Sequence, residues 1–323
     1  MIKEKEAITY WDEQLGSYLL KEPNKHQDLD RDTVNKIGVL EHSPNPPVRQ
    51  YYVLGDVHGS AKRIRDFVKH QPILQYTDNV LVLLGDVGAN FFFNYRDEKF
   101  KEELGKYPFI YFCIRGNHEE RPSNLFNVDT WHMENFEQGA VYVENEYPYI
   151  KYALDYPSIY ALNDKWLTIV YPGAYSVDKY YRIQKGWTWF EDEMLTDNEM
   201  QIGRELAQEM MTHFNGVDLV LSHTCPIVYE PTDLFLSTVD QSTIDKTMER
   251  YLSEIERNLK YKVWLWGHFH QTRIYPQYNN QQPMMLFDDY VLDLNAYMAD
   301  LNNSFNHLLP TWKIDSPGIK MIN

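Results

Sequence analysis

Short apolar runs recur along the chain after residue 50, and each run closes on a small polar cluster. Five runs share this form, namely YYVLGDVHG at 51–59, VLVLLGDVG at 80–88, FIYFCIRGNHE at 109–119, VDLVLSHTCP at 217–226 and VWLWGHFH at 263–270. Short runs rich in Val, Leu, Ile and aromatic side chains are typical of buried β-strands. The pattern therefore predicts buried strands whose carboxyl ends carry Gly, Asp, Asn and His.

Helical periodicity lies between these runs. Residues 60–70 place apolar side chains at i, i+3 and i+4, at Ile64, Phe67 and Val68. Thr196 with Glu199 forms a capping-box pattern, which predicts a helix that extends to about Phe214. Ser242 is expected to start another helix, with an apolar face made of Ile244, Met248, Leu252, Ile255 and Leu259. Strands that alternate with helices predict an α/β fold, with the polar clusters along one edge of a parallel sheet.

The two ends of the chain lack this alternation. Residues 1–49 are polar and close on a loop of dense prolines, Pro44, Pro46 and Pro47. Prolines so closely spaced block a helix and mark a boundary. We expect an N-terminal arm over 1–49 with short helices, one of them at about Thr9 to Leu20. A domain over 50–300 and a C-terminal tail over 301–323 that packs on this domain are expected to follow.

Composition and charge remove several classes of protein. The chain has 323 residues, with 31 basic and 47 acidic side chains and a formal net charge of -16. This balance disfavours a protein that coats a nucleic-acid backbone, although it does not exclude a nucleic-acid substrate. No run is long enough for a membrane span and no secretory signal is visible, so no membrane association is expected. Two cysteines are too few for a disulfide framework, and we expect a cytoplasmic location.

The polar clusters contain a mixed set of metal-binding side chains. The spacing is even where βαβ units are expected, with 30 positions from Asp56 to Asp86 and 31 from Asp86 to Asn117. The full set is Asp56, His58, Asp86, Asn117, His223, His268 and His270. Imidazole, carboxylate and amide donors without a thiolate suit Mn, Fe, Zn or a similar divalent ion rather than a structural zinc site. Such a large set is natural for two metals that share one bridging carboxylate.

In this order, the five clusters resemble the sequence blocks of the calcineurin-like metallophosphoesterases. The blocks are GDVHG (55–59), GDVG (85–88), RGNHE (115–119), SH (222–223) and GHFH (267–270), and the resemblance extends from about 50 to 300. It implies a four-layer α/β/β/α sandwich of two mixed sheets flanked by helices. It also implies two divalent ions, Mn²⁺ first, with Fe, Zn or Ni as alternatives.

The resemblance assigns a role to each ligand. One metal would be held by Asp56, His58 and His270, and the other by Asn117, His223 and His268. Asp86 would bridge the two metals.

The same resemblance implies a reaction in which a hydroxide that bridges the metals attacks phosphorus in line. Arg115 would neutralise charge on the phosphate oxygens, and His118 would protonate the leaving oxygen. Two plainer interpretations stay open: His118 as a supporting residue, and Arg115 as the partner of a nearby carboxylate.

The second block departs from the pattern of the protein phosphatases in this family. Those enzymes have an Asp and an Arg where this chain has Ala89 and Asn90. The departure removes one phosphate contact and the carboxylate that would orient His118, but it does not affect the metal ligands. The chain is therefore more similar to bacterial and phage members of the family.

A stretch between the third and fourth blocks, residues 172–193, is rich in aromatic and basic side chains. Arg182 is predicted as a second phosphate contact and Tyr175 as a substrate contact. Ordinary packing of these aromatic rings is the alternative.

The leading hypothesis for the function is hydrolysis of a phosphomonoester, on a phosphorylated small molecule, nucleotide or phosphoprotein. The alternative is a phosphodiesterase or nuclease that acts on a cyclic nucleotide, a dinucleotide or a nucleic-acid end. A non-catalytic binding module on the same fold ranks lower, because all seven ligand positions are retained.

Overall fold

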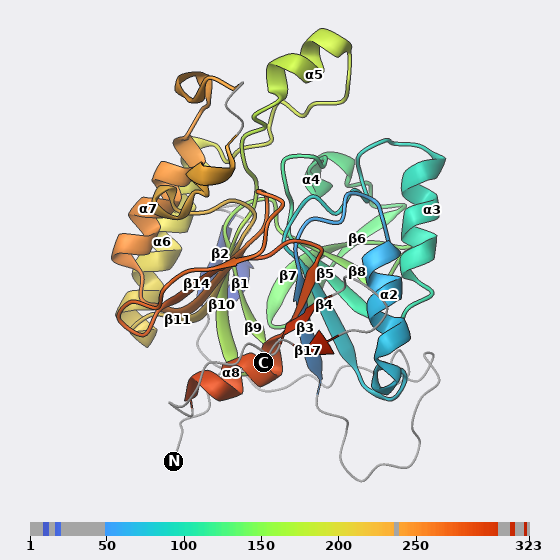
Figure 1. Cartoon of the computed structure of the whole chain (residues 1–323), viewed down its shortest axis with the longest axis horizontal. Helices are drawn as coiled ribbons and strands as arrows, with labels where there is room; N and C mark the ends of the chain where they lie inside the picture. The colour runs from blue at the N-terminus through green and yellow to red at the C-terminus, as the bar shows by residue number, and fades with distance from the viewer. Residues whose placement is uncertain are drawn as a thin grey trace.

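Two mixed β-sheets lie face to face, and helices cover both outer faces (Figure 1). The computed structural model describes residues 9–12, 17–20, 49–235, 239–302, 311–313 and 320–321. The arrangement is the four-layer α/β/β/α sandwich that the resemblance implied.

The larger sheet has the strand order β17-β16-β15-β3-β4-β5-β8-β7-β6. Its central parallel strands are β3 (Gln50–Leu54), β4 (Asn79–Leu83), β5 (Ile110–Cys113) and β8 (Ile150–Ala153). Antiparallel strands extend it on both sides: β6 (Trp131–Phe136), β7 (Gly139–Glu144), β15 (Tyr290–Asp293), β16 (Thr311–Lys313) and β17 (Lys320–Met321).

The smaller sheet has the order β13-β14-β12-β11-β10-β9. Its parallel strands are β10 (Trp166–Tyr171), β11 (Val217–Ser222), β12 (Tyr261–Trp266) and β14 (Gln282–Met285). The antiparallel strands β9 (Ser158–Leu162) and β13 (Arg273–Ile274) form its edges. The five strands predicted from the apolar runs are therefore confirmed as β3, β4, β5, β11 and β12. They divide between two sheets rather than sharing the single parallel sheet that the alternation predicted.

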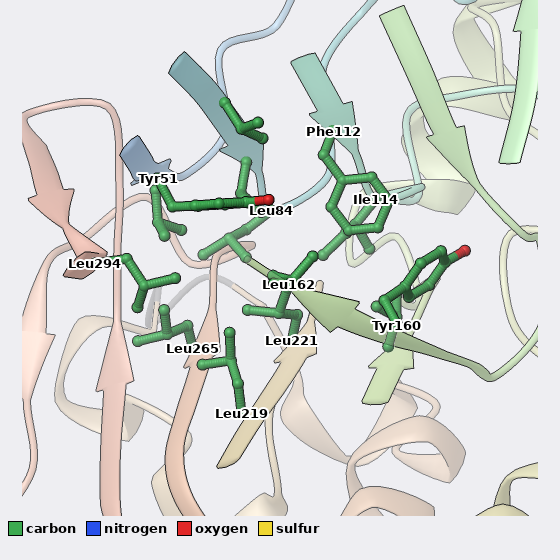
Figure 2. Close-up of a cluster of buried hydrophobic side chains, with 14 of the residues drawn as sticks. Tyr51, Leu84, Phe112, Ile114, Tyr160, Leu162, Leu219, Leu221, Leu265 and Leu294 are labelled. Atoms are coloured by element: carbon green, nitrogen blue, oxygen red, sulfur yellow. The ribbon is translucent and has the colours of Figure 1, made fainter. Parts of the chain in front are cut away.

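Alternation along each strand builds the separate layers of the core. In β4, Val80 and Val82 point into the space between the sheets, whereas Leu81 and Leu83 point toward the helices. Figure 2 shows how side chains from both sheets meet in that space, among them Tyr51, Phe112, Leu162, Leu221 and Leu265. Each such side chain contributes about 1.5–3 kcal/mol when fully buried. Both faces of each sheet are apolar because both are covered.

The helices pack on the outer faces of the two sheets. In Figure 1, α2 (Lys62–His70) and α3 (Tyr95–Leu104) lie beside the larger sheet, and α6 (Asp197–Phe214) and α7 (Thr247–Asn258) beside the smaller one. The capping box predicted for α6 is present, because Thr196 and Glu199 bond each other's backbone N–H groups. The remaining helical segments are η1 (Pro72–Tyr76), α4 (Pro122–Leu125), α5 (Lys179–Lys185), η2 (Ile227–Tyr229), η3 (Thr232–Leu234), η4 (Gln241–Thr243) and α8 (Leu294–Asn302).

Two predicted helices were wrong in part. Ser242 does not start α7 but lies within η4, and Asp245 accepts the backbone N–H of Thr247 at the first helical position. The expected helix from Thr9 to Leu20 is replaced by two antiparallel strands, β1 (Thr9–Asp12) and β2 (Ser17–Leu20). Their sequences TYWD and SYLL are rich in aromatic and β-branched residues, which favour strands.

The rest of the predicted arm and most of the predicted C-terminal tail lie outside the described residues, so the expected domain boundaries stay predictions. Among the described residues, none of the helices combines the length and the apolar composition that a membrane span requires.

Candidate metal centre

The seven predicted ligands lie at one edge of the sandwich, where parallel strands of both sheets end. Each follows its strand directly: Asp56 and His58 after β3, Asp86 after β4, Asn117 after β5, His223 after β11, and His268 and His270 after β12. Two hydrogen bonds cross between the sheets here, one from the His268 N–H to Asp56 Oδ1 (2.9 Å) and one from His223 Nδ1 to the Leu84 carbonyl (2.7 Å). The carboxyl ends of parallel strands are where α/β folds collect their binding residues.

The backbone at these strand ends is held in an uncommon conformation. Four of the ligands have left-handed φ angles, namely His58 (47°), Asp86 (47°), His268 (70°) and His270 (51°). A non-glycine residue in this region costs of order 1–3 kcal/mol and is typical of functional sites. The neighbouring Gly116 permits the close approach, since a Cβ there would lie 2.1 Å from Asp86 Oδ1. The chain therefore tolerates local strain to aim these side chains at one place.

One half of the centre is open to solvent and consists of Asp56, His58 and His270. The Nε2 atoms of the two imidazoles are 2.8 Å apart, and Asp56 Oδ2 lies 3.5 Å from Nε2 of His270. Asp56 Oδ2 is buried and has no hydrogen-bond partner among the described residues. The donor atoms of these three side chains and of Asp86 all lie within 4.8 Å of one another. A buried carboxylate oxygen without a donor is costly, and a cation would supply its missing partner.

The other half contains Asn117 and His223, which are buried, and His268, which is partly exposed; we call it the buried half. Because Nδ1 of His223 donates to the Leu84 carbonyl, its Nε2 faces Asn117 Oδ1 (2.9 Å) and Asp86 Oδ1 (3.4 Å). The ring of His268 lies 5.0 Å from that of His223, centroid to centroid. A backbone carbonyl behind a histidine is the usual means of fixing a metal-binding imidazole.

The electrostatics of the buried half also match a cation site. Although burial opposes the charged form, the Asp86 carboxylate raises the pKa of His223 to about 9. Burial also opposes ionisation of Asp86, but His223 and neighbouring imidazoles hold its pKa well below the ordinary value. Burial, followed by the charge of His223, lowers the pKa of His268 well below normal. His268 is therefore the neutral ligand that a metal needs, and a divalent ion would take the place of the proton on His223.

These observations fit the pair of divalent ions that the donor set implied. In each half two atoms that can each bind a metal lie close together, Nε2 of His58 beside Nε2 of His270 and Nε2 of His223 beside Asn117 Oδ1. Asp86 contacts both halves, since its Oδ1 lies 3.4 Å from His223 Nε2 and its Oδ2 lies 3.9 Å from His58 Nε2.

The structure places His118 and Arg182 together at the edge of this centre. The His118 N–H donates to Asp86 Oδ1 (2.8 Å), and its Nε2 lies 3.3 Å from Nη2 of Arg182. The guanidinium is anchored by Asp178 (2.8 Å) and by the carbonyl of Thr188 (3.3 Å). Because a guanidinium can only donate, Nε2 of His118 is the acceptor in this contact. Burial and the charge of Arg182 lower the pKa of His118 even though Asp86 opposes them.

Arg115 is almost fully buried and bonds the backbone. It is 3% exposed, and its Nη1 donates to the backbone carbonyls of Glu193 (2.8 Å) and Gly116 (3.3 Å). Its Nε lies 4.0 Å from Asp155 Oδ1. The plainer interpretation, a buried arginine beside a carboxylate, describes its contacts, and the predicted role in neutralising phosphate charge stays a prediction.

The aromatic residues of 172–193 divide into a buried and an exposed group. Tyr175 is 5% exposed, with the Lys179 ammonium 5.8 Å from its ring centroid, and its role as a substrate contact stays a prediction. Helix α5 has no buried residue and projects beyond the sheets (Figure 1). On it and just after it, Tyr180, Tyr181 and Trp187 are at least half exposed. Ordinary packing therefore describes Tyr175 but not these three rings.

Two further residues at this site were not predicted. Ser176 accepts a hydrogen bond from the side-chain amide of Asn117 (2.9 Å), and its own hydroxyl donates to Glu193. Both lie within 172–193, but no spacing rule links a serine to a metal ligand 59 positions away.

Comparisons with known proteins identify a family model and solved structures that are similar to this chain. Residues 49–272 match the family model described as calcineurin-like phosphoesterase. Similar solved structures include a protein from Thermus thermophilus (12% identity, 77% of this chain and 96% of that chain, TM-score 0.42). A dimetal phosphatase from Danio rerio is also similar (12% identity, 76% and 95%, TM-score 0.42). No curated protein matches the sequence.

Proposed function

Because the chain belongs to the calcineurin-like phosphoesterase family, we propose that it hydrolyses phosphoric esters with two divalent cations, and that its simplest substrate is a phosphomonoester. The observation that carries this proposal is the convergence of seven nitrogen and oxygen donors from both sheets, with Asp56 Oδ2 buried and lacking a donor among the described residues. We place Mn²⁺ first, because imidazole, carboxylate and amide ligands without a thiolate suit it.

The residues of the metal centre would have different roles in the reaction. Two divalent cations would polarise the phosphoryl group and make a water acidic enough to attack at neutral pH. Asp86 keeps the two halves of the centre together through its two oxygens. Arg182 offers a guanidinium, which can donate to a phosphoryl oxygen. Once Arg182 turns to the phosphate, Nε2 of His118 is free to carry a proton to the leaving oxygen.

A phosphodiesterase that acts on a nucleotide is the second candidate, and the exposed rings favour it. Tyr181 and Trp187 contact each other edge-on (5.4 Å), and the Lys185 ammonium lies 5.5 Å from the Tyr181 ring centroid. Exposed aromatic rings beside cations are the usual platform for a nucleotide base and its phosphate. These residues belong to the same segment that brings Arg182 to His118.

The test is hydrolysis by protein that has been stripped of metal and reloaded with Mn²⁺. We expect p-nitrophenyl phosphate to be cleaved with a higher kcat/KM than bis(p-nitrophenyl) phosphate. The reverse order would favour the diesterase. No cleavage of either ester, with two Mn²⁺ bound per chain, would contradict both candidates and leave a binding module.

His118→Ala tests the proton donor in the same assay. Loss of the acid is expected to lower kcat by about 10²–10⁴-fold while the metal content is unchanged. If the variant instead loses metal, His118 supports the ligands and is not the acid.

A further inference from the structure

A short chain of buried polar groups runs from the base of the α5 segment to the metal ligand Asn117. Nδ2 of Asn117 donates to Ser176 Oγ (2.9 Å), and the Ser176 hydroxyl donates to Glu193 Oε2. The backbone N–H of Ser176 donates to the other oxygen of the same carboxylate (3.0 Å). Ser176 and Glu193 are each 1% exposed, so no bulk water competes for these bonds.

The direction of these bonds decides which end of the Asn117 amide faces the metal centre. A side-chain amide has an oxygen at one side and an NH₂ group at the other, and either side can face a neutral hydroxyl. A carboxylate can only accept, so it takes the single proton of the Ser176 hydroxyl. Ser176 Oγ is then left as an acceptor, which binds NH₂ and turns the amide oxygen toward His223.

We propose that Ser176 and Glu193 are positioning residues that hold the Asn117 amide oxygen toward the cation in the buried half of the centre. The inference rests on the proposed function, because it assumes a cation there. Groups behind a metal ligand that orient it are typically worth about 10–100-fold in metal affinity.

The positions of Ser176 and Glu193 in the chain give their role in orienting Asn117 a second consequence. Ser176 and Glu193 stand on either side of α5, and their bonds join the two ends of the segment that carries Arg182. The carbonyl of Glu193 also accepts from the buried Arg115 (2.8 Å), which fixes that end to the strand-end loop before Asn117. The hydrogen bonds between Ser176 and Glu193 therefore orient the metal ligand and also determine where Arg182 meets His118.

The test is calorimetric titration of metal-free protein with Mn²⁺, comparing the wild type with Ser176→Ala. The variant is expected to lose about 10–100-fold in affinity at one of its two sites and to keep the other. Ser158→Ala is the matched control, because Ser158 is also buried (4% exposed) and bonds a neighbour, the Tyr160 hydroxyl (3.3 Å), away from the ligands. Equal unfolding temperatures of the two metal-free variants separate positioning from general loss of stability.

Asn117→Asp provides a second measurement, and a merely structural role of Ser176 would not change its result. A carboxylate presents an oxygen toward the cation in either orientation, so Ser176→Ala should cost much less affinity in the Asn117→Asp background than in the wild type. Glu193→Gln replaces the carboxylate that can only accept, and it is expected to lower the Mn²⁺ affinity of the same site. This variant takes the place of Ser176→Ala if Ser176→Ala does not fold.

The outcomes separate the inference from the proposed function. A wild type with two Mn²⁺ sites and a Ser176→Ala variant with unchanged affinity at both would overturn the inference alone. A wild type that takes up no Mn²⁺ would overturn the proposed function and the inference with it.

Discussion

The two halves of the metal centre differ in how firmly the protein holds them. In the open half, the side chains of His58 and His270 are 38% and 51% exposed, and their Nε2 atoms contact each other. In the buried half, Asn117 and His223 are at most 2% exposed, and each is fixed from behind, by Ser176 and by the Leu84 carbonyl. The ligands of the buried half are thus held by protein groups behind them, whereas in the open half Asp56 accepts the His268 N–H and the two exposed imidazoles contact each other.

This difference predicts that the two cations bind in sequence. Preorganised ligands lose little freedom on binding, so the buried half should take up its cation first and hold it more tightly. The open half should exchange its cation with solvent more readily.

The largest expected effect comes from the residue that joins the halves. Asp86→Asn removes the shared negative charge, so both cations should bind more weakly and turnover should fall by about 10³-fold or more. Metal analysis after gel filtration, together with the rate on p-nitrophenyl phosphate, measures both losses. Full activity in this variant would show that the halves are independent and that Asp86 does not bridge them.

Removing one histidine from each half tests the order of binding directly. His223→Ala should abolish the tight step of a Mn²⁺ titration, whereas His270→Ala should abolish the weak step and leave the tight one. Both variants should turn over far more slowly than the wild type, because the proposed reaction needs both cations. A His270→Ala variant that lost the tight step would reverse the assignment of the halves.

A smaller effect is expected outside the ligands. Arg182→Ala removes a charge-assisted hydrogen bond of about 1.5–3 kcal/mol, so kcat/KM should fall by about 10–100-fold while both cations stay bound. Lys179→Ala is the control, because Lys179 lies on the same helix and its ammonium contacts the Trp189 ring instead of His118. Equal losses in the two variants would mean that α5 contributes only general positive charge.

The smallest effect on turnover is expected for Glu249→Gln, behind the buried half. Glu249 accepts from the Thr224 hydroxyl (2.8 Å), next to His223, and burial raises its pKa from 4.5 to about 7. Between these pH values the unfolded chain loses this proton while the folded chain keeps it, so stability falls as pH rises, by about 3 kcal/mol in total.

Chemical denaturation at pH 5 and pH 7.5 measures how the free energy of unfolding changes with pH, which we call the slope. Glu249→Gln should flatten it relative to the wild type, whereas Glu205→Gln, on the exposed face of α6, should leave it unchanged. A wild-type slope retained in Glu249→Gln would place the titrating group elsewhere.

Local sequence was sufficient for the five strands that the predicted ligands follow. Asp56, Asp86 and His223 each follow an apolar run directly, so a correct strand places the side chain at the sheet edge. The direction of a side chain beyond that edge is not a local property. Arg115 lies in the same block as Asn117, yet its guanidinium bonds the carbonyl of Glu193, 78 positions away.

Residues that act through another residue were the hardest to predict. Ser176 and Glu193 are buried polar groups whose role follows only from the fold, because the residue that they orient, Asn117, follows a different strand.

The N-terminal strands were missed for a different reason. Short polar segments with scattered aromatics fit helix and strand patterns almost equally well.

The hydrogen bonds that cross between the sheets at this edge have a consequence for the whole sandwich. Since β3, β4 and β5 belong to one sheet and β11 and β12 to the other, separation of the sheets would scatter the ligands of both cations. Free cation concentration is therefore a thermodynamic variable of folding, and a hundredfold excess over the dissociation constant adds about 2.7 kcal/mol per site to the free energy of unfolding. A chelator in the buffer would lower the melting temperature of the entire domain, including parts far from any phosphate.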